Sequence, residues 1–196
     1  MIFENFFNAE VLLQAFPLLL TGLKFTLILS VIVISGGILL GCVAASFYAT
    51  SGRWVRLAII LLIDMFRSLP PLVLLMFVFY GLPYAGLRLG PFTATCIALI
   101  LNTSSYYAEV FRAGIESIRK GQWEAAKASG ISETGILRHV ILPQAVKNVL
   151  PDVVGNSVDA VKVTSYASVV AIPELVRAAM IARETTYNAS PLIAAA

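Results

Sequence analysis

Long uncharged stretches alternate with short charged segments along the chain, and this pattern predicts helices that cross a membrane. Residues 25–52, 68–87 and 89–108 contain no charged side chain. About 20 apolar helical residues cross the roughly 30 Å of hydrocarbon in a bilayer, so each stretch is long enough. A fourth, more polar candidate follows. We therefore predict an all-α integral membrane protein, a helical bundle in one domain over residues 1–196, with spans at about residues 20–48, 57–80, 90–113 and 144–172.

Two of the predicted spans carry polar features, and those of the fourth span would not be tolerated by a lipid-facing helix. In the second span, Asp64 and Arg67 share one helix face, and Pro70-Pro71 is expected to kink or interrupt the helix. In the fourth span, Asp159 and Lys162 are three residues apart. These two residues, with the following Thr164 and Ser165, predict either a polar patch facing a translocation pathway or an internal salt bridge. Asn102 in the third span could add hydrogen bonds to a pathway or between helices.

Composition agrees with the membrane class. Hydrophobic residues make up 59% of the chain, charged residues only 13%, and the mean hydropathy is +0.87. Soluble domains are roughly 25% charged, so this composition disfavours disordered chains, disulfide scaffolds and nucleic-acid-binding proteins. Cys42, Cys96 and the single His139 match no metal or haem spacing. We expect no metal site and no catalytic residue.

The basic residues predict the orientation in the membrane. Arg53 and Arg56 lie in the first connection, and many basic residues surround the third connection, whereas the second connection contains only Arg88. By the positive-inside rule the first and third connections face the cytosol and the N-terminus faces outside. An apolar run begins at Ser190 and is too short to span a bilayer, so we expect the chain to be truncated at its C-terminal end.

The third connection, about residues 114–143, is expected to be a structured cytosolic loop. Its sequence from residue 122 is QWEAAKASGISETGILRHVILP, which predicts two short helices. The first is rich in alanine, contains Glu124 three residues before Lys127, and can end at Gly130 in the left-handed conformation. Ser132 can cap the second helix, and Pro143 is expected to mark the entry into the next span. An exposed alanine-rich helix with one aromatic residue, Trp123, suits insertion into a groove of another protein.

This loop resembles the signature loop of permease subunits of ABC importers, which reads E-A-A, three residues, G, nine residues and I-x-L-P. Six identities match at the right spacing, with Val140 in place of the usual Ile: Glu124, Ala125, Ala126, Gly130, Leu142 and Pro143. Three further stretches resemble the branch of that family for polar amino acids: residues 20–26, residues 67–83 and residues 107–115. Lys162-Val163-Thr164-Ser165 resembles the family's K-D-T-S, but Val163 replaces the acidic residue.

The resemblance implies a permease subunit in a bacterial inner membrane that works as a homodimer or heterodimer. It implies an external solute-binding protein and two ATPase subunits as partners, with ATP and Mg²⁺ held by the ATPases. It also implies that the loop docks the ATPases and that polar amino acids, basic ones among the candidates, are the cargo. The family has a fifth span after residues 173–175, and this sequence stops before one. The chain contains no G-x-x-x-x-G-K-[ST] phosphate loop, so any ATP dependence must come from a partner.

Two other readings stay open from the residues alone. A self-contained secondary transporter or channel would use the intramembrane charges for ion coupling and would need no ATPase. An intramembrane hydrolase would need a nucleophile motif, and none is visible in the sequence.

Overall fold

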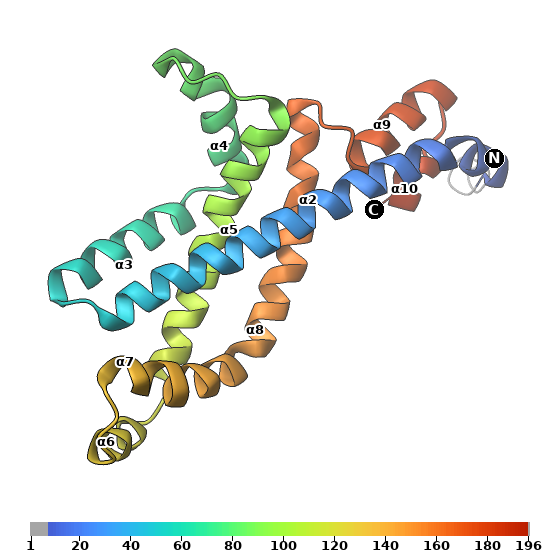
Figure 1. Ribbon diagram of the computed structural model, residues 1–196. Helices are drawn as coiled ribbons and strands as arrows, with labels where there is room; N and C mark the ends of the chain where they lie inside the picture. Colours follow the sequence, from blue (N-terminus) through green and yellow to red (C-terminus); the bar gives the residue numbers. More distant parts are fainter. Residues whose placement is uncertain (1–7, 196) are drawn as a thin grey trace. The chain divides into compact units, whose positions relative to one another are not determined.

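The computed structural model describes residues 8–195, and every regular element in that range is helical. The first half of the chain, traced in Figure 1, contains α2 (Ala9–Thr50), α3 (Arg53–Ser68), α4 (Pro71–Met76), η1 (Phe77–Gly81), η2 (Leu82–Ala85) and α5 (Pro91–Glu116). The second half contains α6 (Lys120–Ala128), α7 (Glu133–Ile136), η3 (Leu137–Ile141), α8 (Leu142–Val163), η4 (Thr164–Val170), α9 (Leu175–Thr186) and α10 (Ser190–Ala195). The expectation of an all-α fold is confirmed.

Helix α2 is the most apolar of the described helices. It is 42 residues long, begins well before residue 20, and its most apolar window has a mean hydropathy of 2.6. By length and composition, it is the one described helix that could cross a membrane, and the number rises to three if each of two bent helix pairs counts as one span. The four spans inferred from the sequence stay a prediction.

A proline pair interrupts the second apolar segment, as the sequence predicts. Helix α3 ends at Ser68, and Leu69 adopts an extended conformation with φ −83° and ψ 124°. The ring of the following Pro70 disfavours a helical conformation at Leu69, which ends the helix there. Helix α4 then begins at Pro71, where the missing N–H costs nothing because first-turn donors have no partner in the helix.

The described chain forms two compact units, each assembled from separate stretches of sequence. Unit 1 contains the described residues up to Val33, Pro71–Leu99, and the chain from Ala160 onward. Unit 2 contains Ile34–Pro70 and Ile100–Asp159. Helices α2, α5 and α8 each contribute to both units, so neither unit is a contiguous segment of the chain.

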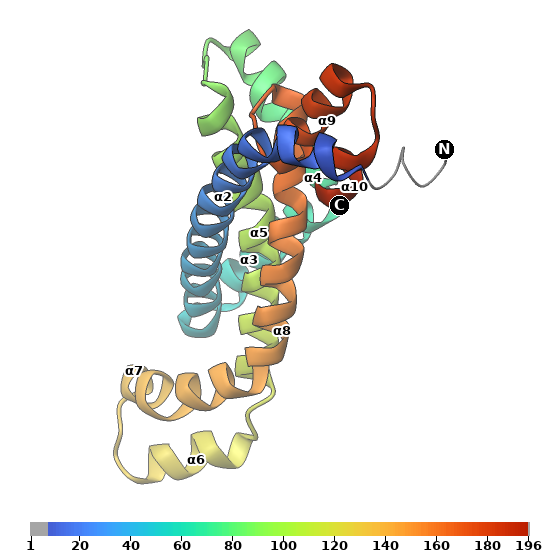
Figure 2. The same cartoon turned by 90° about the vertical axis from the view of Figure 1, so that its right-hand side faces the viewer.

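Unit 1 holds the ends of the described chain together. The N–H of Leu175, at the start of α9, donates to Oγ1 of Thr26 on α2 over 3.0 Å, and the N–H of Asn8 donates to Oγ of Ser190 over 2.9 Å. Glu174 is buried and caps α9 by accepting from the N–H groups of Val176 and Arg177. These bonds position α9 and α10 beside the first part of α2 (Figures 1 and 2).

Unit 2 packs the second part of α2 closely against α5. A Cβ placed on Gly41 would lie 2.7 Å from Cβ of Tyr107 and 2.8 Å from the backbone N of Ala108, so only glycine allows this approach. Tyr107 is fully buried, and its hydroxyl lies 2.7 Å from Oγ of Ser157 on α8. These contacts join α2, α5 and α8 within unit 2.

Candidate functional site

Helix α6 ends in a tight turn that places Gly130 at its outer edge. The N–H of Gly130 donates to the carbonyl of Lys127 over 3.0 Å, and the N–H of Ile131 donates to the carbonyl of Ala126 over 3.3 Å. This pair of bonds defines a Schellman motif, and it requires the left-handed conformation that Gly130 adopts with φ +75°. The predicted helix stop at Gly130 is therefore confirmed. In Figure 2, α6 and α7 lie at one end of unit 2, beyond the ends of α5 and α8.

Helix α7 begins at the predicted cap but does not end where the sequence suggested. The side chain of Ser132 accepts from the N–H of Gly135 over 3.3 Å, which confirms the cap. The expectation of a separate short helix before Pro143 is wrong, because the helix runs from Glu133 to Val170 without a break. Pro143 is tolerated because it lies where the wide turn of η3 gives way to α8. The second loop helix therefore continues into α8, which contains Pro151, and Figures 1 and 2 show that this helical run changes direction along its length.

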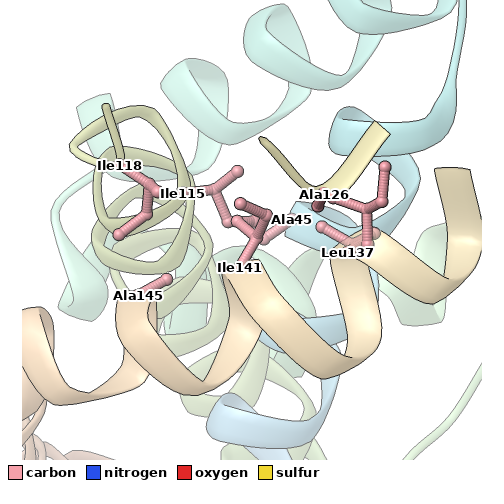
Figure 3. Close-up of a cluster of buried hydrophobic side chains, with 8 residues drawn as sticks. Ala45, Ile115, Ile118, Ala126, Leu137, Ile141 and Ala145 are labelled. Atoms are coloured by element: carbon pink, nitrogen blue, oxygen red, sulfur yellow. The ribbon is translucent and has the colours of Figure 1, made fainter. Parts of the chain in front are cut away.

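The inner face of the loop packs on a buried cluster, which we call the loop core. Its buried side chains come from α2, α5, the turn after α5, α6, α7, η3 and α8: Ala45, Ile115, Ile118, Ala126, Ile136, Leu137, Ile141 and Ala145. Figure 3 shows Ala126 directed toward Ala45, Leu137 and Ile141. Trp123 and Leu142 are partly buried against the same cluster. Trp123 and Ala126, both expected at the docking surface, thus face the protein's own interior.

The outer face of the loop remains available to another molecule. Glu124, Ala125, Gly130 and Pro143 are exposed, and a Cβ on Gly130 would meet no atom within 4 Å. Lys127 does not pair with Glu124 as its spacing suggested, since its Nζ lies 3.1 Å from Oε1 of Glu133. This exposed ion pair joins α6 to α7 and contributes about 0–1 kcal/mol.

Asn102, a candidate for the substrate pathway, supports the break in the second apolar segment. Its side chain is only 3% exposed, and Nδ2 donates to the carbonyls of Phe66 and Leu69 over 3.2 and 3.3 Å. The proline pair removes the N–H groups that would otherwise help satisfy carbonyls at this helix end. Asn102 therefore replaces backbone donors that the sequence of α3 and α4 lacks.

The remaining pathway candidates lie near the end of α8 and in η4. Thr164 is fully buried, and its hydroxyl donates to the carbonyl of Val161, whereas Ser165 is half-buried and donates to the carbonyl of Lys162. Asp159 and Lys162 are exposed, and each takes part in at least one interaction. Asn102 and Asp159 belong to unit 2, whereas Lys162, Thr164 and Ser165 belong to unit 1.

A charged network in unit 2 was only partly visible in the sequence. Arg67 pairs with Asp64 at 3.7 Å, as the spacing predicts, and also with Glu109 of α5 at 3.8 Å. Arg112 bonds both Glu109 and Glu116 on its own helix. The positions of these carboxylates, three before and four after Arg112, are the signal that could have revealed the network. Within residues 8–195, no group of three or more His, Cys, Asp and Glu side chains could hold a metal ion.

Residues 37–196 match the model of a protein family described as binding-protein-dependent transport system inner membrane component. The probable amino-acid ABC transporter permease protein YckA of Bacillus subtilis (strain 168) is 34% identical over 191 residues, covering 94% of this chain and 82% of YckA. The glutamine transport system permease protein GlnP of Escherichia coli (strain K12) is 37% identical over 174 residues, covering 87% of this chain and 79% of GlnP.

A solved structure supports the same relationship. The crystal structure of an amino acid ABC transporter with histidines contains a chain that superimposes on this fold with a TM-score of 0.88 at 33% sequence identity. The match covers 96% of this chain and 89% of that chain.

Proposed function

Because the chain belongs to the family of inner membrane components of binding-protein-dependent transport systems, we propose that it is the permease subunit of an ATP-driven importer of polar amino acids. Residues 1–196 act as one membrane domain, and two permease chains, identical or different, form the translocation pathway between them. The N-terminus lies outside the cell, and the α6–α7 loop lies in the cytosol.

One observation carries the amino-acid assignment. YckA and GlnP, which are named for amino acids and glutamine, align with this chain over 94% and 87% of its length at 34% and 37% identity. Neutral polar and basic amino acids are both candidates for the cargo. Val163 bears on the choice, because the K-D-T-S segment that this part of the chain resembles has an acidic residue at that position. The carboxylate of such a residue would favour a cationic side chain in the cargo.

The α6–α7 loop supports the proposal that ATPase subunits dock on this chain. Its outer face presents Glu124, Ala125 and Gly130, while its inner face is anchored in the loop core by Ala126 and Trp123. A helix that is exposed on one face and packed on the other can transmit a displacement to the helices beneath it. Because α7 continues through η3 into α8, a movement of the loop would be passed to α8, the helix that carries Asp159.

The proposed partners follow from this mechanism. ATP and Mg²⁺ bind the ATPase subunits, and an extracytoplasmic solute-binding protein delivers the amino acid from outside. The permease itself changes no bond in the cargo. Binding and hydrolysis of ATP shift the pathway between outward-facing and inward-facing states through the loop.

The proposal is tested by purifying the full-length protein in detergent, identifying the proteins that accompany it, and reconstituting the complex in proteoliposomes. We expect an ATPase to co-purify and labelled glutamine, or another polar amino acid, to accumulate only when ATP and a binding protein are supplied. Uptake by the permease alone, driven by an ion gradient without nucleotide, would instead establish the secondary transporter.

Docking is tested separately by two variants, in each of which an exposed alanine is replaced by arginine. Ala125→Arg places a long cation on the outer face of α6, whereas Ala85→Arg places one at the exposed end of η2. We expect Ala125→Arg to abolish co-purification of the ATPase and Ala85→Arg to preserve it, with equal amounts of both variants in the membrane. Retention of the ATPase by Ala125→Arg would reject the docking surface.

A further inference from the structure

A cavity opens beside the turn between α2 and α3. Its volume is about 580 Å³, and it is lined by Ser51, Gly52, Arg53, Arg56, Leu57 and Ile60. The lining divides into two parts. Ser51 and the two arginines supply polar and cationic groups, whereas Leu57 and Ile60, one turn further along α3, supply an apolar wall. A molecule that fits both parts must itself be amphipathic.

The positive charge in this cavity has no carboxylate partner among residues 8–195. No described carboxylate pairs with Arg53 or Arg56, and the first turn of α3 contains no acidic residue. Glu116 accepts from the hydroxyl of Tyr48, whose ring lies against Arg56, but Arg112 already pairs with this carboxylate. The cavity therefore attracts an anion.

Arg56 is held in a fixed position by neutral groups. Its Nε donates to the carbonyl of Tyr48 over 2.9 Å, and its Nη2 donates to the carbonyl of Ala49 over 3.0 Å. The guanidinium also lies 5.5 Å from the centre of the Tyr48 ring. These contacts orient the side chain but do not neutralise its positive charge. Arg56 is therefore pre-organised for an anionic ligand. Arg53, three residues earlier, lies on the same helix face and is exposed.

The surface around the cavity is suited to the boundary between water and lipid. Trp54 is 79% exposed, and Val55 and Leu61 are 50% and 61% exposed. Tryptophan is enriched at membrane interfaces, where its ring meets acyl chains and its N–H meets polar groups. Exposed apolar side chains next to arginines that have no described carboxylate partner match the two parts of a phospholipid.

We propose that this cavity binds an anionic phospholipid. Arg53 and Arg56 contact the phosphate of the headgroup, and Leu57 and Ile60 contact the first methylene groups of the acyl chains. The site requires only that the chain lies in a membrane, and it does not depend on the cargo or on the ATPase. Basic pockets on the cytosolic side of membrane proteins bind anionic headgroups by this chemistry.

The test uses the fluorescence of Trp54, which adjoins the cavity. The chain contains two tryptophans, so Trp123→Phe leaves Trp54 as the single reporter. The full-length protein is reconstituted in phosphatidylcholine vesicles that contain a fixed fraction of brominated phosphatidylglycerol or of brominated phosphatidylcholine. Bromine quenches tryptophan on contact, so the ratio of quenching measures the preference of this surface for the anionic lipid.

We expect a preference of roughly fivefold or more for phosphatidylglycerol, since each basic residue near an anionic surface contributes about that factor. Arg53→Gln should lower the preference about fivefold, and the further change Arg56→Gln should remove what remains. Arg138→Gln, which removes an exposed arginine from η3 outside the cavity, should leave it unchanged. Equal quenching by the two lipids, or a preference that Arg53→Gln does not lower, would overturn the proposal.

A soluble anion is distinguished by competition. If inorganic phosphate abolishes the preference while sodium chloride at the same ionic strength does not, the cavity binds free phosphate and the lipid assignment is wrong. We expect both salts to weaken the preference equally, because screening acts on the arginine charges without regard to the chemistry of the anion.

Discussion

The guanidinium of Arg112 donates from Nη2 to Oε1 of Glu109 over 2.6 Å, and the two residues lie three positions apart on α5. The same guanidinium bonds Glu116 at 2.9 Å, one turn in the other direction. The hydroxyl of Tyr48 on α2 donates to Glu116 over 2.6 Å. Arg112 therefore connects α5 to α2 within unit 2, close to the loop core.

We predict that Arg112→Gln destabilises the protein. The Arg112 and Glu109 side chains are 22% and 27% exposed, so removing the cation leaves a partly desolvated carboxylate without its main partner. The expected cost is about 2 kcal/mol, measured as a lower thermal midpoint in detergent. Arg119→Gln, just beyond α5, removes an exposed arginine and should change the midpoint little. Equal midpoints for the two variants would show that the network does not stabilise the fold.

Two substitutions at Gly130 distinguish two roles of this residue: ending α6 in the left-handed conformation, and allowing another protein to approach closely. Asn tolerates the left-handed conformation that Gly130 adopts, whereas Ala is strained there by about 1 kcal/mol. If Gly130 serves only to end α6, uptake should survive Gly130→Asn better than Gly130→Ala. If the ATPase approaches this surface closely, both variants should lose the ATPase on co-purification. We expect the second result, because the space beside Gly130 is open.

Replacing two helical glycines of unit 2 by alanine should change the stability of the protein in opposite directions. Gly41→Ala would place Cβ 2.7 Å from Cβ of Tyr107, and overpacking of this kind costs about 1–3 kcal/mol. Gly155→Ala meets no atom within 4 Å, and it should stabilise α8 by about 0.5–1 kcal/mol. Thermal midpoints of the two variants, compared with the unmodified protein, test both signs at once. A stabilising Gly41→Ala would show that α2 and α5 are further apart than described.

Asn102→Ala tests whether Asn102 acts on the fold or on the cargo. Its loss leaves the buried carbonyls of Phe66 and Leu69 without their side-chain donor, at a cost of about 1–3 kcal/mol. We expect a lower thermal midpoint and an unchanged KM for uptake by the protein that remains folded. Asn148→Ala is the control, because this side chain is exposed and its hydrogen bond to the Ser117 hydroxyl is open to water, so both quantities should change little. A raised KM for uptake with an unchanged thermal midpoint would show instead that Asn102 contacts the cargo.

The sequence alone predicted the features that depend on neighbouring residues. Gly130 ends α6, Ser132 caps α7, and the proline pair interrupts the helix after Ser68, because a cap or a missing N–H acts within one helical turn. The pairing of Arg67 with Asp64 was predictable for the same reason, since residues three apart share a helix face. The loop signature also identified the family, because it combines fixed identities with fixed spacing.

Only the tertiary structure decided which side chains face inward and which partners they meet across the chain. Nothing local distinguishes Ala125 from Ala126, yet Ala126 is buried in the loop core and Ala125 is exposed, because α2, α5 and α8 cover only one face of α6. The two carbonyls that Asn102 bonds lie 36 and 33 residues away in sequence. Hydrophobic periodicity reports how much of a helix is buried, whereas the identity of the buried partner depends on how distant helices pack.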